Sequence, residues 1–475
     1  MSSNDLDAIL HQADTDRGRL DGAAIGPFSL TALGIAAVVG AGIFVTTGVA
    51  ASQYAGPAVV ISFIIAGFAA AATSLCYAEM AAMIPAAGST YSYAYATFGG
   101  FLAWVIGWDL LLEYLFGGST VAVGWSGYFV SAMESIGITI PHDLTQPPFG
   151  DDAGIINLPA IFIVLAMCGL LAFGTRESAR ANNAMVALKL GILVLFIVVG
   201  AWYIKDANWQ PFLPANEGGF GEFGWTGVLR AAGVVFFAYI GFDAVSTAAA
   251  EARDPKRTIP IGLLGTVIIS TTLYVAIAGV MTGMASYKVL DVADPLTAAV
   301  RAAGPSLDWL EAMLSIAAVI GLAATVMVVF YGQTRILMRM ASDGLLPDWM
   351  GKVSGKHKTP VGATAICAVG GAICAGLLPI DALANLVSIG TLFAFVIVCS
   401  AVLVLRRKRP ELERPFRVPA LPLVAGIGIL AAVALIAMLP ATTWIRLIVW
   451  LLIGLAIYYG WGRANSRARM ASLGD

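Results

Sequence analysis

The 475-residue chain is 59% hydrophobic and only 12% charged, which excludes an ordinary soluble protein, because soluble domains carry about 25% charged residues. Its net charge of −2 says little about partners, and its three histidines are scattered, so no metal cluster is visible. The five cysteines lie in apolar segments, where we interpret them as small core residues. Apolar runs of about 20 residues recur from end to end, so we predict an all-α polytopic membrane protein.

Residues 1–26 are polar and acid-rich, and they lack the apolar core and cleavage site of a signal peptide. We expect a cytoplasmic tail here, with the first span acting as the insertion signal. The apolar runs and their flanking charges then predict twelve transmembrane helices. They lie near residues 28–52, 57–84, 101–131, 157–175, 181–204, 226–251, 259–284, 308–340, 360–378, 382–405, 418–439 and 442–462.

The basic residues test this count. With a cytoplasmic N-terminus, most of the 27 Lys and Arg residues fall on the cytoplasmic side, as the positive-inside rule requires. The densest basic stretch, "RRKRPELERPFR" at 406–417, lies between two spans, so we interpret it as an orienting cytoplasmic loop and not as a nucleic-acid-binding patch. We expect both termini in the cytoplasm and the protein in the plasma membrane, the inner membrane of a bacterium.

The first span contains a weak point at half depth. Gly40 and Gly42 flank Ala41 in an apolar run, and each glycine weakens a helix by about 1 kcal/mol relative to alanine. A helix that unwinds there frees backbone N–H and C=O groups that lipid cannot satisfy, so these groups must face a cavity or a ligand. The alternative is that the glycines only let neighbouring helices pack closely.

The sixth span has a soft centre of the same kind at 237–241. It opens a second set of five spans, and because five is an odd number, the two sets have opposite orientations. Glycine-interrupted segments at matching places in two halves indicate a transporter site. A half-helix N-terminus suits a carboxylate and freed carbonyls suit an ammonium, so two broken helices side by side predict a receptor for a zwitterion.

Four stretches resemble the amino acid–polyamine–organocation superfamily and, within it, the cationic amino acid transporter family in a bacterial-type form. They are "FSLTALGIAAVVGAGIFV" (28–45), "YAEMAAMIPAAGSTYSYAYATFGG" (77–100), "FFAYIGFDAVSTAAAEARDPKRTIP" (236–260) and "YGQTRILMRMASDGLLP" (331–347). The resemblance runs from about residue 26 to the last spans. It implies ten helices in a 5+5 inverted repeat with broken helices 1 and 6, followed by two C-terminal helices.

The resemblance also implies a substrate site. The substrate carboxylate would lie near the first weak point, at Val38, Ala41, Gly42 and Ile43. The ammonium would lie at the carbonyls of Phe237, Ala238 and Ile240, with the Phe237 ring as a lid. Relatives commonly carry threonine where this chain has Ala41, so a hydroxyl contact is absent.

Lys189 lies inside the fifth predicted span, about eight residues or roughly 12 Å from its cytoplasmic start. The side chain either snorkels to the interface or faces the bundle, where desolvation disfavours the charged amine and lets it exchange a proton near neutral pH. In some proton-coupled relatives, a lysine on helix 5 puts its amine at the cation site of sodium-coupled members. We therefore expect proton coupling at Lys189, with no metal and with the proton in place of any cofactor.

Other ionisable residues lie inside or at the ends of spans. Asp109 and Glu113 are four residues apart, so they share a helix face. We expect Glu113 near the substrate cavity, because relatives often carry a carboxylate there, and Asp109 as a packing position. Asp243 is expected to brace the second soft centre. An inner gate of salt bridges and an ordinary charged loop are both consistent with the cluster Glu251, Arg253, Asp254, Lys256, Arg257, Arg335 and Arg339.

These features predict a secondary active transporter that imports free L-amino acids by alternating access, with an amino acid exchanger using the same site as the alternative. No ring of like residues indicates a channel, and no nucleophile–base pair indicates an enzyme. Cationic and small neutral amino acids both stay open as substrates, and membrane lipid is the other expected partner. We expect a cytoplasmic tail (1–26), a first five-helix repeat (27–204), an extracellular linker (205–225) and an inverted second repeat (226–405). A basic cytoplasmic loop (406–417), helices 11 and 12 (418–462) and a second cytoplasmic tail (463–475) follow.

Overall fold

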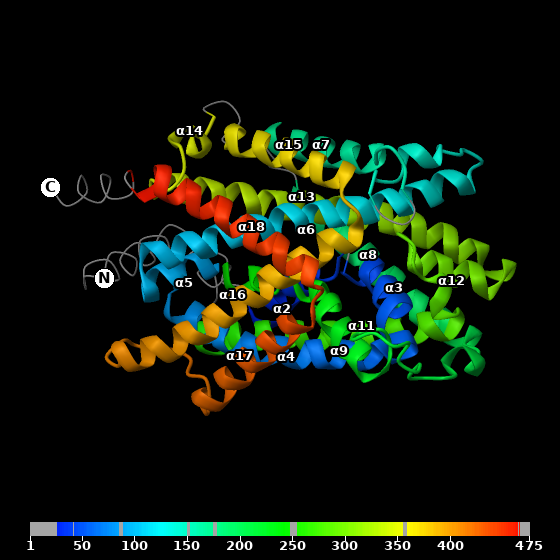
Figure 1. The fold of residues 1–475 in the computed structure, drawn as a ribbon, viewed down its shortest axis with the longest axis horizontal. Coiled ribbons are helices and arrows are strands. Elements are labelled where there is room, and N and C mark those ends of the chain that lie inside the picture. The colour runs from blue at the N-terminus through cyan, green and yellow to red at the C-terminus, as the bar shows by residue number, and fades with distance from the viewer. Residues whose placement is uncertain are drawn as a thin grey trace.

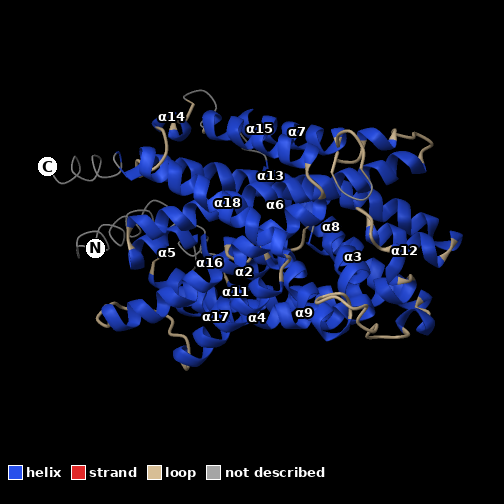
Figure 2. Ribbon diagram, in the orientation of Figure 1, coloured by secondary structure: helices blue, strands red, loops and turns tan. Residues whose placement is uncertain are grey.

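The structure is a computed structural model that describes residues 26–40, 42–84, 89–149, 153–173, 178–247, 254–354, 359–463 and 465. Within these residues the regular structure is helical throughout, and Figure 2 shows no strand in the part of the chain that it colours. The expectation of an all-helical fold is therefore confirmed for the described residues.

The helices follow the predicted apolar runs in chain order. The first half contains α2 (Pro27–Val38), α4 (Val59–Met83), α6 (Gly100–Ser135), α7 (Leu158–Phe173) and α8 (Ser178–Gly200). The second half contains α9 (Gly224–Val235), α11 (Pro255–Met284), α13 (Asp308–Ser342), α15 (Val361–Leu377) and α16 (Ile380–Lys408), and the chain ends with α17 (Leu421–Met438) and α18 (Ala441–Ile457).

Among the described residues, eight helical stretches are long and apolar enough to cross a membrane. The other predicted spans correspond to shorter helices: α2 and α9 have 12 residues each, α7 has 16 and α15 has 17. The two shortest, α2 and α9, are short because each is interrupted where the sequence places its glycine-containing soft centre. The architecture is that of a multi-pass membrane protein.

Several long helices, such as α6 and α13, run along the long axis of the molecule, whereas α16 and α18 cross it obliquely (Figure 1). Helices α2 and α4 both lie against α11, and α6 lies against α13 and α16. Glycines make these contacts close, as is common between membrane helices. The Phe330 ring of α13 lies over Gly118 of α6, and the Tyr114 ring of α6 lies over Gly332 of α13.

Three short helices were not among the predicted spans, and one of them, α14 (Asp348–Gly351), has only four residues. Helix α5 (Ser89–Phe98) and helix α12 (Pro295–Ala303) lie at opposite ends of the bundle (Figure 1). Helix α12 begins with a proline, which is pre-organised for the first helical position. The preceding Asp294 accepts a hydrogen bond from Ser131 of α6 at 2.5 Å, and burial raises the pKa of this carboxyl. Hydropathy alone misses such helices because they are short and only partly apolar.

The basic segment after α16 is fastened to α4. Glu79 of α4, 1% exposed, receives hydrogen bonds from the Arg406 guanidinium, at 2.8 Å for its Nε, and from the Val418 backbone N–H at 2.7 Å. The Arg414 Nε lies 3.6 Å from the same carboxylate. Other Arg414 nitrogens donate to backbone carbonyls of the segment, including Leu412 at 2.6 Å and Arg409 at 2.8 Å. Of the loop predicted at 406–417, residues 406–408 are the last turn of α16, and the rest folds around a buried carboxylate.

Helix α18 is held on α6 by tryptophans. The Trp108 and Trp450 rings stack at a centroid distance of 4.7 Å. Each indole N–H donates to the other residue's carbonyl, Trp108 to Trp450 at 2.8 Å and Trp450 to Trp108 at 3.0 Å. The neighbouring Trp104 donates to Gly454 at 3.0 Å. The paired indoles, with their N–H groups hydrogen-bonded, fix the position of α18 against α6, although most of α18 is exposed.

Candidate functional site

The first interruption follows α2. The helix ends at Val38, residues 39–40 form a bend, and a π-helical turn, η1 (Gly42–Thr46), begins two residues later. The Ile43 and Phe44 N–H groups turn back to the Gly40 carbonyl at 3.2 and 3.3 Å. Ala41, one of the predicted carboxylate ligands, lies outside the described residues. The chain then continues through α3 (Thr47–Ala50) and a second π-helical turn, η2 (Ala51–Ala55), toward α4.

The second interruption follows α9. A 3₁₀ turn, η7 (Phe236–Tyr239), leads into a non-helical segment in which Ile240 is extended and Gly241 has a φ of +95°. This φ lies in the left-handed region that glycine tolerates best, so the glycine permits the break. The short helix α10 (Ala244–Thr247) resumes the chain. The soft centre expected at 237–241 is therefore a real interruption, as is the one near Gly40.

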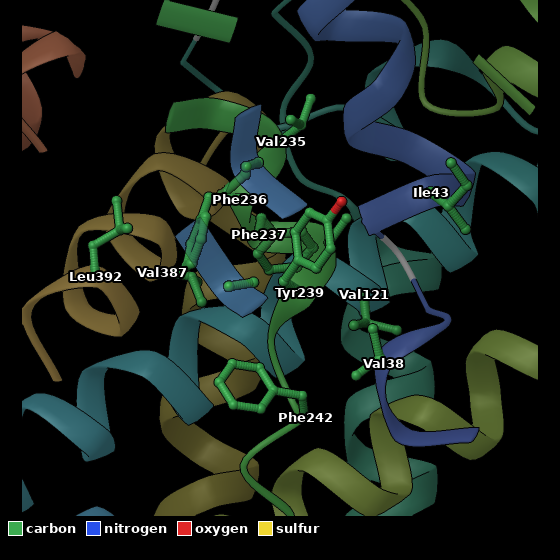
Figure 3. Packing of buried hydrophobic residues seen from close by; sticks show 14 of the residues in the cluster. Val38, Ile43, Val121, Val235, Phe236, Phe237, Tyr239, Phe242, Val387 and Leu392 are labelled. Atoms are coloured by element: carbon green, nitrogen blue, oxygen red, sulfur yellow. The ribbon is translucent and has the colours of Figure 1, made fainter. Parts of the chain in front are cut away.

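The two interruptions touch each other, as the close-up of the cluster around Val38, Ile43 and Phe237 shows (Figure 3). A Cβ added at Gly42 would lie 2.2 Å from the Ala238 Cα, and one added at Gly241 would lie 3.2 Å from the Ala37 carbonyl oxygen. The glycines thus allow close packing as well as unwinding, and the two explanations that the sequence left open are compatible. Val38, Gly42, Ile43, Phe237 and Ala238 are all buried, and Ile240 is half-buried.

A tyrosine that the sequence reasoning missed joins the two interruptions. The Tyr274 hydroxyl of α11 lies 3.0 Å from the Val38 carbonyl oxygen and 2.8 Å from the Ala238 carbonyl oxygen. Both carbonyls belong to residues at which a helix stops or unwinds, so the single hydroxyl proton is shared between two main-chain groups that the breaks release. The sequence signal that could have identified Tyr274 is a hydroxyl inside an apolar span, because a buried tyrosine usually needs a hydrogen-bond partner.

Further hydroxyls hold the broken helices in place. The Tyr239 hydroxyl donates to the Phe63 carbonyl of α4 at 2.9 Å, and the Tyr128 hydroxyl of α6 donates to the Phe44 carbonyl of η1 at 2.7 Å. These bonds tie each interrupted segment to a continuous helix. The breaks are therefore anchored to the neighbouring continuous helices.

Lys189 of α8 points into the bundle. Its side chain is 2% exposed, and its Nζ donates to the Ala36 carbonyl at 2.9 Å, in the last turn of α2. The Thr325 hydroxyl of α13 lies 3.5 Å from the same nitrogen. Thr325 also contacts Gly40, because a Cβ there would lie 3.1 Å from its methyl group. The amine thus joins α2, α8 and α13 next to the first interruption, which excludes snorkelling to the interface in this structure.

The acidic residues of α6 lie apart from this lysine, against α16. Glu113 is 3% exposed and lies beside the Thr391 side chain, in the neighbourhood of Asp243 and Asp109. Asp109 is fully buried next to Gly390, and among the described residues its two carboxylate oxygens have no hydrogen-bond partner. Glu113 therefore lies in the neighbourhood of Asp243, which follows Gly241 of the second interruption.

Two members of the cluster expected to form either an inner gate or an ordinary charged loop have other partners in the structure. Arg335 stacks on the Tyr331 ring at 4.7 Å, and Arg339 pairs with Asp343 at 3.3 Å, so both have partners near the end of α13. Asp343 also accepts a hydrogen bond from Tyr91 of α5 at 2.7 Å. Two other members of the expected cluster, Glu251 and Arg253, lie outside the described residues.

Two broken apolar helices are in contact, and a buried lysine lies beside the first break. The amino acid permease family model matches residues 25–458, and the chain belongs to this family. The expected membership of the amino acid–polyamine–organocation superfamily is thereby confirmed.

Individual relatives are similar over most of the chain. The branched-chain amino acid permease BcaP of Bacillus subtilis (strain 168) is 45% identical over 93% of this chain and 94% of its own length. The methylthioribose transporter of the same organism is 42% identical over 92% and 93%. The vacuolar cationic amino acid transporter 2 of Arabidopsis thaliana is 35% identical over 81% of this chain and 60% of its own length. All three are named as permeases or transporters, in agreement with the expectation that the chain is not an enzyme.

Proposed function

We propose that this protein is a secondary active transporter that imports free L-amino acids by alternating access, with proton coupling at Lys189. The observation that carries the proposal is the direct contact of two interrupted helices, each with main-chain groups released in the middle of an apolar segment. In lipid such groups are tolerated where they line a cavity or meet a ligand. Twelve spans in a 5+5 inverted repeat, with both termini cytoplasmic, complete the proposal.

The substrate carboxylate is assigned to the N–H groups at the start of η1, near Gly42 and Ile43, because a helix N-terminus favours an anion. The ammonium is assigned to the carbonyls of the second break, at Phe237, Ala238 and Ile240. The Ala238 carbonyl has two lone pairs, so it can accept from Tyr274 and from an ammonium together. Because Gly42 and Ala238 are in contact here, binding requires these segments to separate.

Proton coupling is assigned to Lys189 from its surroundings. The amine is buried against the Ala36 carbonyl and the Thr325 hydroxyl, two acceptors that bear no formal charge. Among the described residues no acid pairs with this amine, so a change in its protonation can change how firmly α2 is held. A proton drives the cycle only if the two states of the transporter bind it with different affinity.

The first substrates to test are leucine, isoleucine and valine. The segments around the breaks are apolar, and a relative named as a branched-chain amino acid permease is 45% identical. Methylthioribose belongs in the same panel, because a relative named for its transport is 42% identical. Arginine and lysine stay in the panel as well, because the Glu113 carboxyl group lies beside Thr391 and away from Lys189, where it is available to a cationic substrate side chain.

The test is uptake of this panel by purified protein in liposomes, with and without an inward proton gradient. We expect wild-type protein to accumulate apolar amino acids only with the gradient, and Lys189→Ala to lose gradient-driven accumulation. Lys205→Ala is the matched control, because Lys205 is exposed beyond the end of α8. Accumulation by Lys189→Ala at the wild-type level would refute proton coupling there, and gradient-independent counterflow would favour an exchanger.

A further inference from the structure

A groove lies at the surface of the bundle, where the mostly exposed helix α18 crosses α6 (Figure 1). We call it the α6–α18 groove. It has a cavity volume of about 140 Å³ and is partly open to the outside. An apolar cavity of about 150 Å³ is large enough to bind benzene, so this groove has room for an apolar group. Its walls are formed by Phe101, Trp104, Val105 and Trp108 of α6 and by Leu451 and Leu455 of α18.

The walls of the groove leave no polar group free for water. The two indole N–H groups are already used, since Trp104 donates to the Gly454 carbonyl at 3.0 Å and Trp108 donates to the Trp450 carbonyl at 2.8 Å. Gly454 forms the floor, and a Cβ there would lie 2.4 Å from Cδ1 of Trp108. The other wall side chains are hydrocarbon. Because an ordered water needs two to four polar partners, the occupant of this groove must be apolar.

The groove lies at the depth of lipid acyl chains. Leu455 and Leu451 precede Arg463 by 8 and 12 residues, which is roughly 12 and 18 Å at 1.5 Å per residue. Between them and Arg463, Tyr459 is 60% exposed and Trp461 is 48% exposed. Exposed tyrosine and tryptophan next to arginine are typical of the membrane–water interface. Half of the hydrocarbon core is about 15 Å thick, so the groove lies within one leaflet, which is the cytoplasmic one in the proposed orientation.

A cation lies at the interfacial end of the groove. Arg463 follows the last turn of α18, η11 (Tyr458–Gly462), and its guanidinium lies over the Tyr459 ring at 5.9 Å. The side chain is exposed, and no carboxylate among the described residues forms an ion pair with it. A guanidinium binds phosphate oxygens with two parallel hydrogen bonds. The surface thus combines an apolar groove with an anion-binding group one to two helical turns beyond it.

Shape and charge together favour one kind of occupant. A helix of a second copy is about 10–12 Å wide, so it cannot enter a groove of this volume and could insert only single side chains. A sterol fits an apolar groove but offers no anion to Arg463. A phospholipid has both parts in the required order, with a phosphate at the interface and a narrow hydrocarbon chain below it. A net negative headgroup suits the unpaired guanidinium best.

We infer that the α6–α18 groove is a binding site for an anionic phospholipid of the cytoplasmic leaflet, with one acyl chain between Leu455 and Trp104 and the phosphate at Arg463. The site is separate from the interrupted helices, so the inference does not depend on which solute the protein transports. The bound chain covers the apolar walls of the groove and adds contacts between α6 and α18 to those of the stacked tryptophans.

The first test is native mass spectrometry of the delipidated protein titrated with phosphatidylglycerol, and with phosphatidylethanolamine of the same chains. We expect Leu455→Trp, which fills the groove, to raise the Kd for phosphatidylglycerol about tenfold. Arg463→Gln should raise it about fivefold and remove the preference over phosphatidylethanolamine. Leu452→Trp and Arg446→Gln are matched controls, because both residues are exposed on α18 away from the groove, and they should change this Kd less than about twofold. Val105→Trp replaces Leu455→Trp if the latter folds poorly.

The second test locates the lipid without any substitution. Phosphatidylglycerol with a photoactivatable diazirine in its acyl chain is cross-linked to the protein in liposomes, and the labelled peptides are sequenced. We expect labels concentrated at 101–108 and 451–455. Labels spread evenly over the exposed spans, or equal Kd values for the Leu455→Trp and Leu452→Trp variants, would refute the site. Cross-links between two copies through Leu455 would assign the groove to a dimer instead. Failure of amino acid uptake would refute the proposed function and leave this site standing.

Discussion

Replacing Glu79 should destabilise the protein more than replacing an acid in an exposed ion pair. Glu79 accepts from Arg406 and from the Val418 N–H, and its side chain is 1% exposed. Arg414, whose side chain is 3% exposed, lies 3.6 Å away. Glu79→Ala leaves this guanidinium without its counter-charge and the Val418 N–H without its acceptor. The segment that follows α16 then loses its attachment to α4.

The magnitude follows from the burial of each partner. Removing one member of a buried ion pair costs about 3–5 kcal/mol. The Arg406 side chain is 28% exposed, so water offsets part of its loss and we expect about 3 kcal/mol for Glu79→Ala. Glu79→Gln keeps an acceptor for Val418 and should cost about 1–2 kcal/mol. Glu311→Gln is the control, because its partner Arg301 is 54% exposed and such pairs contribute about 0–1 kcal/mol.

Equilibrium unfolding in mixed micelles, followed with a thiol-reactive dye, measures these differences. Cys76, Cys168, Cys367 and Cys399 are buried, so the dye reports loss of packing. A double-mutant cycle with Arg406→Gln isolates the pairwise contribution. If Glu79→Ala unfolded within about 1 kcal/mol of the wild-type protein, or if Glu311→Gln cost as much, the reasoning from burial would be wrong.

Two further predictions concern the interruptions. Tyr274→Phe removes the donor shared by two released carbonyls. It should therefore lower the free energy of unfolding by about 1–2 kcal/mol and raise the KM for leucine. A variant indistinguishable from wild type in both assays would show that water replaces the hydroxyl. Gly42→Ala should abolish leucine uptake, because its Cβ would lie 2.2 Å from the Ala238 Cα. Gly426→Ala in α17 is the control and should be tolerated, because its Cβ would meet no atom within 4 Å. Equal uptake by both variants would count against the contact between the two interruptions.

Local features of the sequence were enough to predict much of this fold. Apolar length determines which segments enter a bilayer, since each helix satisfies its own backbone there. The effect of glycine is local, because the residue itself permits backbone conformations that interrupt a helix. The interruptions at Gly40–Gly42 and at 237–241 were therefore predictable from residue type and position. A lone lysine within a span identified Lys189 as a residue of interest, although the sequence left its orientation open.

Only the tertiary structure decided which groups meet. Tyr274 reaches the Val38 carbonyl across 236 residues of chain, and Lys189 reaches the Ala36 carbonyl across 153. Arg406 and Glu79 are 327 residues apart, yet they form one buried cluster. Local propensity carries no information on such pairs, because they depend on the relative rotation and depth of packed helices. Membrane helices are apolar on nearly all sides, so their sequences give little indication of rotation, and the packing of large side chains over small ones determines it.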